Sequence, residues 1–179
     1  MSRQGLARRE AMTKPLILIG LGGNLPSPSH GAPKTTLTAA LERCEAAGIH
    51  VTARSRWYES EPVPKSTQPN FINAVVRVET TMAPAALLAV LHRIEKEFGR
   101  TRAARNAPRC IDLDIIAYGD KVTRGDAVPA LPHPRMHERA FVLLPLREIA
   151  PRWYHPFLGC TVDQLIERLP RSQLARPIA

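Results

Sequence analysis

The segment CIDLDIIAY at residues 110–118 decides the fold, because it completes a regular series of strand and helix patterns. Its aliphatic residues favour a β-strand, and Gly119 and Asp120 favour a turn directly after it. A helical pattern precedes it along the chain, and two strand patterns precede that helix. The segment is therefore expected to be the last strand of a β-α-β-β-α-β unit.

Hydrophobic spacing and the positions of proline and glycine define the other elements. We expect strand 15–19 with a turn at 20–24, helix 35–47, strand 50–58, loop 59–69, strand 71–78 and helix 84–98. This order is typical of an α/β (α+β) ferredoxin-like fold, a βαββαβ core with an antiparallel sheet and its helices on one side. Residues 122–179 are expected to form a C-terminal extension with helices near 141–146 and 161–169.

Size and composition predict a single domain. The chain has 179 residues, of which 44% are hydrophobic, and this is enough for one sizeable core. We expect a basic, disordered extension at 1–14, one domain at 15–179 and no fused second enzyme, and Met12 offers an alternative translation start. The first residues lack the apolar centre of a secretory signal, and no run of about 18 apolar residues occurs, so we expect a cytoplasmic protein that does not bind a membrane.

The charge distribution indicates a polyanionic partner. A formal net charge of +9 and a pI near 10.2 would suit a nucleic acid, an anionic surface or a nucleoside triphosphate. Arg100, Arg102, Arg105 and Arg109 stand close together without an intervening acid, although a solvated loop would show the same run. The three cysteines form no C-x-x-C pair, so neither a disulfide framework nor a zinc site is indicated.

Asp112 and Asp114 are candidate metal ligands. Because they are two residues apart on a strand, their side chains leave the same face, while Leu113 and Ile115 face the other side. Carboxylates this close repel each other unless a cation lies between them, and such oxygen pairs suit Mg²⁺ bound jointly to substrate phosphates. The arginine-rich loop leads directly into this strand and would bring guanidinium groups to those phosphates. A pair of solvated acids at a strand end is the alternative.

Other motifs narrow the choice of chemistry. The chain has no phosphate-loop motif, and its glycines at 20–23 lack the spacing of a dinucleotide fingerprint. Phe71 and Asn73 share a strand face, so a ring and an amide could stack on and read a flat heterocycle, although a core residue and a cap would look the same. A single loop histidine such as His133 is typical of an ordinary surface.

Taken together, five motifs resemble those of one family. They are G-x-G-G-N-L at 20–25, F-I-N-A at 71–74, G-R at 99–100, A-P-R-x-I-D-L-D at 107–114 and P-H-P-R-M-x-E-R-A-F at 132–141. The chain resembles the 6-hydroxymethyl-7,8-dihydropterin pyrophosphokinases of folate biosynthesis from about residue 16 to residue 151.

The resemblance implies an enzyme, a 2-amino-4-hydroxy-6-hydroxymethyldihydropteridine diphosphokinase. Such an enzyme transfers the β,γ-pyrophosphoryl group of ATP to the hydroxymethyl group of the dihydropterin and leaves AMP. Its metal ligands for two Mg²⁺ ions match Asp112 and Asp114, which form the expected catalytic set together with Arg100 and Arg109. No general base is assigned.

The resemblance also assigns the residues that bind the two substrates. The pterin would be bound by Ser60, Val63, Phe71, Asn73 and Phe141. ATP would be bound by Glu95, Arg100, Arg109, Ile115, His133 and Arg139. We expect these two small molecules as partners of a monomer, and we expect no nucleic acid.

One departure from the family pattern and two other functions remain open. Many members carry a tryptophan before G-P-R, whereas this chain has Asn106-Ala107-Pro108-Arg109, which puts an aromatic lid contact in doubt. A basic ferredoxin-like sheet could also be an RNA-binding module, although its aromatic signature is absent and it gives no role to the two aspartates. A Mg²⁺-dependent nucleotidyltransferase would use the aspartates but release pyrophosphate instead of AMP.

Overall fold

The structure is a computed structural model, and it describes residues 14–101 and 106–179. Except for Lys14, the basic extension expected at 1–14 lies outside the described residues, and so do Arg102 and Arg105. None of the helices in the described part of the chain is long and apolar enough to cross a membrane.

The element order confirms the ferredoxin-like core. Its elements are β1 (Ile17–Gly23), α1 (Pro33–Ala46), β2 (His50–Arg54), β3 (Trp57–Ser60), β4 (Phe71–Glu79), α2 (Pro84–Glu97) and β5 (Asp112–Tyr118). The C-terminal elements are the 3₁₀ helix η1 (Met136–Glu138), α3 (Ala140–Ile149), β6 (Tyr154–His155), β7 (Cys160–Thr161), α4 (Val162–Glu167) and β8 (Ala175–Ile178). The main sheet has the order β5-β1-β4-β3-β8, β2 also pairs with β4, and every pairing is antiparallel.

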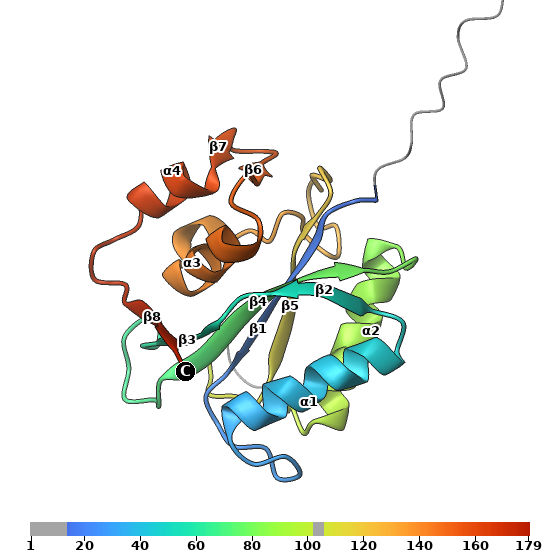
Figure 1. Cartoon of the computed structure of the whole chain (residues 1–179), viewed down its shortest axis with the longest axis vertical. Coiled ribbons are helices and arrows are strands. Elements are labelled where there is room, and N and C mark those ends of the chain that lie inside the picture. The colour runs from blue at the N-terminus through green and yellow to red at the C-terminus, as the bar shows by residue number, and fades with distance from the viewer. Residues whose placement is uncertain (1–13, 102–105) are drawn as a thin grey trace, which may run out of the picture.

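Each face of the sheet carries its own hydrophobic core. Helices α1 and α2 cover one face, where Leu37 and Leu91 pack with Ile19. Helix α3 lies on the opposite side of the sheet, and α4 lies beyond α3, farther from the sheet, as Figure 1 shows. Leu143 of α3 packs with Val75. Strand residues alternate between the two cores because successive side chains leave opposite faces. The C-terminal extension therefore covers part of the face that the two core helices leave open.

The glycines of β1 differ from the sequence-based prediction. A turn was expected at 20–24, but β1 continues through Gly23 and pairs Gly22 with Asn73 of β4. A Cβ atom on Gly23 would lie only 2.4 Å from the carbonyl oxygen of Cys110. Glycine is needed here because two backbones approach each other closely, and not because the chain turns.

Two further strand features were not predicted. The single strand expected at 50–58 is interrupted at Ser55, whose hydroxyl accepts a hydrogen bond from the Val75 amide at 3.1 Å and donates one to the Arg56 carbonyl. Strand β8 extends the sheet by pairing with β3 near the C-terminus, and its Pro177 lies opposite Tyr58. A proline in so short a segment argues against a strand by local pattern, but it is tolerated at a sheet edge.

Replacing Gly23 with alanine is expected to lower the free energy of unfolding by about 1–3 kcal/mol or more, because the neighbouring Cys110 carbonyl belongs to the backbone and cannot move aside easily. Gly20→Ala is the matched control. Its Cβ would meet the flexible end of Ile116 at 3.0 Å, so its effect should be smaller. Urea denaturation measures both, and a Gly23→Ala protein as stable as the wild type would contradict the close-approach explanation.

Candidate active site

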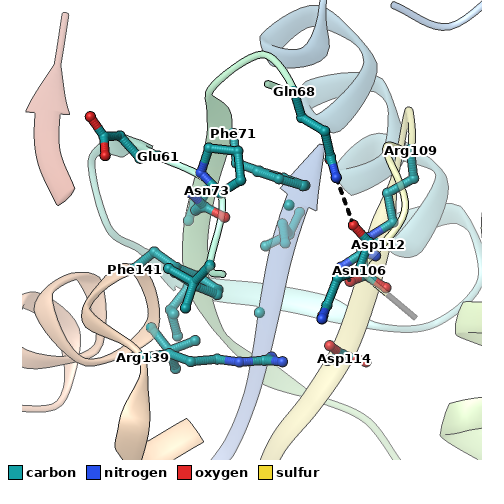
Figure 2. Close-up of a pocket in the computed structure, with 18 of the residues that line it drawn as sticks. Glu61, Gln68, Phe71, Asn73, Asn106, Arg109, Asp112, Asp114, Arg139 and Phe141 are labelled. Atoms are coloured by element: carbon teal, nitrogen blue, oxygen red, sulfur yellow. Dashed lines mark hydrogen bonds and ion pairs between the residues drawn. The ribbon is translucent and has the colours of Figure 1, made fainter. Parts of the chain in front are cut away.

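A cavity of about 290 Å³ opens on the face of the sheet opposite α1 and α2. Gly20 and Gly22 of β1 line it, and the absence of side chains there leaves room above the sheet. Its walls come from the loop between β3 and β4, from the start of α3 and from β5. Figure 2 shows the labelled side chains of this cavity.

The cavity has two aromatic rings on its walls. Phe71 comes from the first residue of β4 and Phe141 from the first turn of α3, and in Figure 2 they lie on either side of Asn73. Each ring has a guanidinium group over it: Arg109 lies 5.7 Å from the Phe71 centroid, and Arg139 lies 5.5 Å from the Phe141 centroid. The arrangement provides an apolar space with positive charge at its edge, which suits a flat ring attached to an anionic group.

Asn73 supplies a polar group between these rings. Its side chain is buried, and its amide nitrogen donates a hydrogen bond to Ser60 Oγ at 2.9 Å. Asn73 and Val63 line the cavity, whereas Ser60 lies behind Asn73 and holds it in place. Because the amide nitrogen is partly used by Ser60, the orientation of the Asn73 side chain is fixed before any ligand binds.

Asp112 and Asp114 project from β5 into the same cavity, as their spacing predicts. Asp112 Oδ1 accepts a hydrogen bond from Arg100 Nη1 at 2.6 Å, and its Oδ2 lies 2.8 Å from Arg109 Nη2. Asp114 Oδ2 lies 3.8 Å from His133 Nε2. The intervening Leu113 is buried in the helix-side core. Strand geometry therefore brings both carboxylates to one point beside two arginines.

Glu95, which the resemblance places among the ATP-binding residues, lies behind β5 beside Arg100. It is buried on α2 and does not line the cavity. Its Oε1 accepts hydrogen bonds from the Leu113 amide at 2.7 Å and from Arg100. Burial raises the pKa of Glu95 to about 7. The position supports a role in holding β5 and Arg100, instead of direct contact with a nucleotide.

The charges of the cavity are strongly shaped by burial. Burial, followed by the neighbouring charge of Asp112, raises the pKa of Asp114 to about 6. Burial and the charge of Arg139 lower the pKa of His133 to about 4, so its imidazole is neutral at pH 7. Burial and the nearby Arg135 also lower the pKa of Arg139. Desolvation is the first cause of each shift, although 39% of the Asp114 side chain remains exposed.

The donor set fits Mg²⁺ that is shared with phosphates. Across residues 14–101 and 106–179, no group of three or more histidine, cysteine or acidic side chains could hold a metal by itself. The adjacent carboxylates of Asp112 and Asp114 are the candidate protein ligands. Mg²⁺ is commonly bound by one or two carboxylates together with substrate phosphates and water. The buried Arg109 Nε has no hydrogen-bond partner among the described residues, so this N–H is available to an anion while Nη2 contacts Asp112.

The remaining predicted contacts are spread around this cavity. Ile115 faces the helix-side core, so only its backbone, on the edge strand β5, could meet a nucleotide. His133 lines a second cavity, of about 700 Å³, together with Leu131 and Phe157. Sequence reasoning missed Gln68 and did not give Asn106 a role, although both line the first cavity. Isolated amide residues in loops offer no pattern that would have identified them.

Mg²⁺ binding should weaken as the pH falls below about 6, because the Asp114 carboxyl, with its pKa raised to about 6, becomes protonated and can no longer act as a ligand. The loss should approach tenfold per pH unit for one proton. Calorimetric titration of Mg²⁺ between pH 5 and pH 8 measures it. Asp114→Asn should bind Mg²⁺ weakly at every pH, whereas Asp120→Asn, on the exposed turn after β5, should keep the wild-type affinity and its pH dependence. Equal affinity at pH 5 and pH 7 would contradict the assignment.

Comparison with known proteins identifies relatives of the chain. Residues 18–151 match the family described as 7,8-dihydro-6-hydroxymethylpterin-pyrophosphokinase. The 2-amino-4-hydroxy-6-hydroxymethyldihydropteridine pyrophosphokinase of Methylorubrum extorquens is 43% identical over 160 residues, which cover 88% of this chain and 96% of that protein. The enzyme of the same name from Synechocystis is 42% identical over 153 residues, which cover 85% of this chain and 75% of that protein.

Other similar proteins are longer than this chain. The folic acid synthesis protein fol1 of Pneumocystis carinii is 40% identical over 153 residues, 86% of this chain but only 20% of that protein. A crystal structure of Plasmodium falciparum HPPK-DHPS with pterin and p-hydroxybenzoate shares the fold, with a TM-score of 0.70 at 15% identity, over 89% of this chain and 44% of that one. This chain therefore spans 20% of the first protein and 44% of the second. The match over residues 18–151 and the two bacterial relatives show that the chain belongs to the 7,8-dihydro-6-hydroxymethylpterin-pyrophosphokinase family.

Proposed function

We propose that this chain transfers the β,γ-pyrophosphoryl group of ATP to the hydroxymethyl group of 6-hydroxymethyl-7,8-dihydropterin and releases AMP. One observation carries the proposal: the space between Phe71 and Phe141 opens directly onto the carboxylates of Asp112 and Asp114. A space that suits a flat heterocycle and a pair of carboxylates that suits metal-bound phosphates thereby lie within one cavity. The names of the bacterial relatives support the same substrates.

The aromatic end of the cavity would bind the pterin. Its bicyclic ring is flat and would lie between Phe71 and Phe141, where burial of both faces stabilises it. The side-chain amide of Asn73, fixed by Ser60, would read the polar edge of the ring. With the ring held in this way, the hydroxymethyl group can point toward β5, which places the attacking oxygen near the phosphates.

The charged end would bind the triphosphate. Arg100 and Arg109 are already held beside Asp112, and an incoming triphosphate would compete with that carboxylate for both guanidinium groups. Asp112 and Asp114 would hold two Mg²⁺ ions, which when bound neutralise the charge that develops on the phosphate oxygens. His133, neutral at pH 7 because its pKa is lowered to about 4, would contribute hydrogen bonding and no positive charge.

In the proposed reaction the pterin hydroxyl oxygen forms a bond to the β-phosphorus of ATP. The bond between that phosphorus and the oxygen bridging it to the α-phosphorus breaks, and AMP leaves with the bond's electron pair. The hydroxyl proton is lost, and we assign no residue to its removal.

Product analysis tests the proposal. The protein is incubated with ATP, Mg²⁺ and 6-hydroxymethyl-7,8-dihydropterin, and the products are separated by chromatography. AMP and a pterin diphosphate in equal amounts are expected. Free pyrophosphate with a nucleotide attached to the pterin would indicate a nucleotidyltransferase instead, and no product from well-folded protein would refute the proposal.

Asp112→Ala and Asp114→Ala should each reduce kcat by at least about a thousandfold, because the metal ions lose one of the two carboxylate ligands that β5 offers to the cavity. Thermal unfolding should show that both variants remain folded. Asp120→Ala removes an exposed acid from the turn after the same strand and should keep wild-type activity. Steady-state kinetics measure kcat, and near-normal turnover in either active-site variant would remove the carboxylates from the mechanism.

Arg109→Ala should lower kcat by about 100- to 1,000-fold while changing the KM for the pterin much less, because a guanidinium group stabilises charge that develops mainly in the transition state. Arg109 also lies over the Phe71 ring, so a modest rise in the pterin KM is expected as well. Arg124→Ala, on an exposed loop, is the control. An increase confined to KM would show that Arg109 serves binding alone.

A further inference from the structure

Asn106 stands where the loop after α2 returns to β5, and it has an unusual backbone conformation. Its φ of 62° lies in the left-handed region, and no other non-glycine residue in the described part of the chain has a positive φ. It lines the same cavity as Arg109, Asp112 and Asp114, and Figure 2 shows its side chain extending toward that cavity. The side-chain amide of Asn106 therefore faces the cavity where its aromatic end meets its charged end.

A chain of amide groups fixes the backbone of Asn106. Gln68 Nε2 donates a hydrogen bond to the Asn106 carbonyl at 2.9 Å. Gln68 Oε1 in turn accepts one from Asn24 Nδ2 at 3.2 Å, and Asn24 is only 3% exposed. Asn24 Oδ1 also accepts a hydrogen bond from the Arg109 amide at 3.0 Å. We call Asn24, Gln68 and Asn106 the amide chain. It holds the loop at Asn106 and at Arg109.

The side chain of Asn106 is not used by the amide chain. Only its carbonyl oxygen takes part, and its side-chain amide has no hydrogen-bond partner among the described residues. Asparagine, aspartate and glycine all tolerate the left-handed conformation. Of these three, asparagine alone offers a neutral N–H donor, and that difference separates a backbone role from a ligand-binding role.

We propose that Asn106 is a substrate-contacting residue, whose side-chain amide donates a hydrogen bond to a phosphate oxygen of ATP where the pterin space meets the carboxylates. This inference rests on the proposed function. The neighbouring Asp112 and Asp114 are anionic and so is the triphosphate, which favours an amide that presents its NH₂ group. A neutral donor adds a hydrogen bond there without competing for the carboxylates, as another arginine would.

Three substitutions of Asn106 separate its side chain from its backbone. Asn106→Gly keeps the left-handed conformation and removes the donor, so thermal stability should be unchanged while the affinity for MgATP falls about tenfold or more. Asn106→Asp keeps both shape and conformation but places a negative charge beside the triphosphate, and its loss should be larger. Asn106→Ala removes the donor and strains the backbone, so it should lose both affinity and thermal stability.

Affinity is measured by calorimetric titration with the nonhydrolysable analogue α,β-methylene ATP and Mg²⁺, and kcat/KM for ATP is measured in parallel. Asn70→Gly is the matched control, because Asn70 is exposed on the loop before β4 and does not line the cavity. It should leave both values within about twofold of the wild type. Wild-type affinity in a stably folded Asn106→Gly variant would overturn the proposal.

The two readouts also separate this inference from the proposed function. If the wild-type protein makes no AMP and no pterin diphosphate, the proposed function fails, yet analogue binding still compares Asn106 variants. If the wild-type protein is active and Asn106→Gly binds the analogue as tightly as it does, only the role of Asn106 fails. Should Asn106→Gly lower the unfolding temperature, the isosteric Asn106→Asp variant decides the outcome.

Discussion

The repulsion between Asp112 and Asp114 is the constraint around which this site is built. The two carboxylates leave the same face of β5, and burial together with the charge of Asp112 raises the pKa of Asp114 to about 6. The protein supplies opposite charge through Arg100 and Arg109, which both contact Asp112. In the proposed function, bound Mg²⁺ would neutralise the remaining negative charge. The carboxylates thus explain why arginines converge on this edge of the sheet.

The ferredoxin-like sheet separates stability from chemistry by using its two faces differently. On one face, α1 and α2 bury a continuous core that includes Leu87 and Ile94. On the other face, α3 packs against β4, and the cavity lies between its first turn and the strands β1, β4 and β5. The same helix places Phe141 and, just before its first residue, Arg139 at the cavity wall. The C-terminal extension therefore completes the site as well as the second core.

Burial of ionisable groups at this site lowers the free energy of unfolding. The pKa of Glu95 is raised to about 7 and that of Asp114 to about 6, which means that burial disfavours their ionised forms. Because these folded-state pKa values are raised, stability from these groups is fully present at low pH and declines as pH rises through about 6 and 7. The contacts of Arg100 with Glu95 and Asp112 offset part of this loss. Such tension between stability and ligand binding is common at functional sites.

Local sequence determined the strand and helix order and the shared face of the two aspartates. These features depend on repeats of two and 3.6 residues, which any short segment reveals. The resemblance of five motifs to one family then supplied substrates and roles that spacing could not. The predicted strand 50–58 and the turn at 20–24 were wrong in detail. The conformations at Ser55 and Gly23 depend on contacts with backbone groups that are distant in the sequence.

Only the tertiary structure decided how the loops meet. Asn24 and Gln68 are 44 residues apart, and Gln68 and Asn106 are 38 apart, yet they form the amide chain beside the cavity. The buried position of Glu95 behind β5 and the pairing of β8 with β3 also became visible only in three dimensions. Local spacing fixes the direction in which a side chain leaves its own strand or helix. Which partner it meets depends on packing between distant segments, and no local pattern encodes that choice.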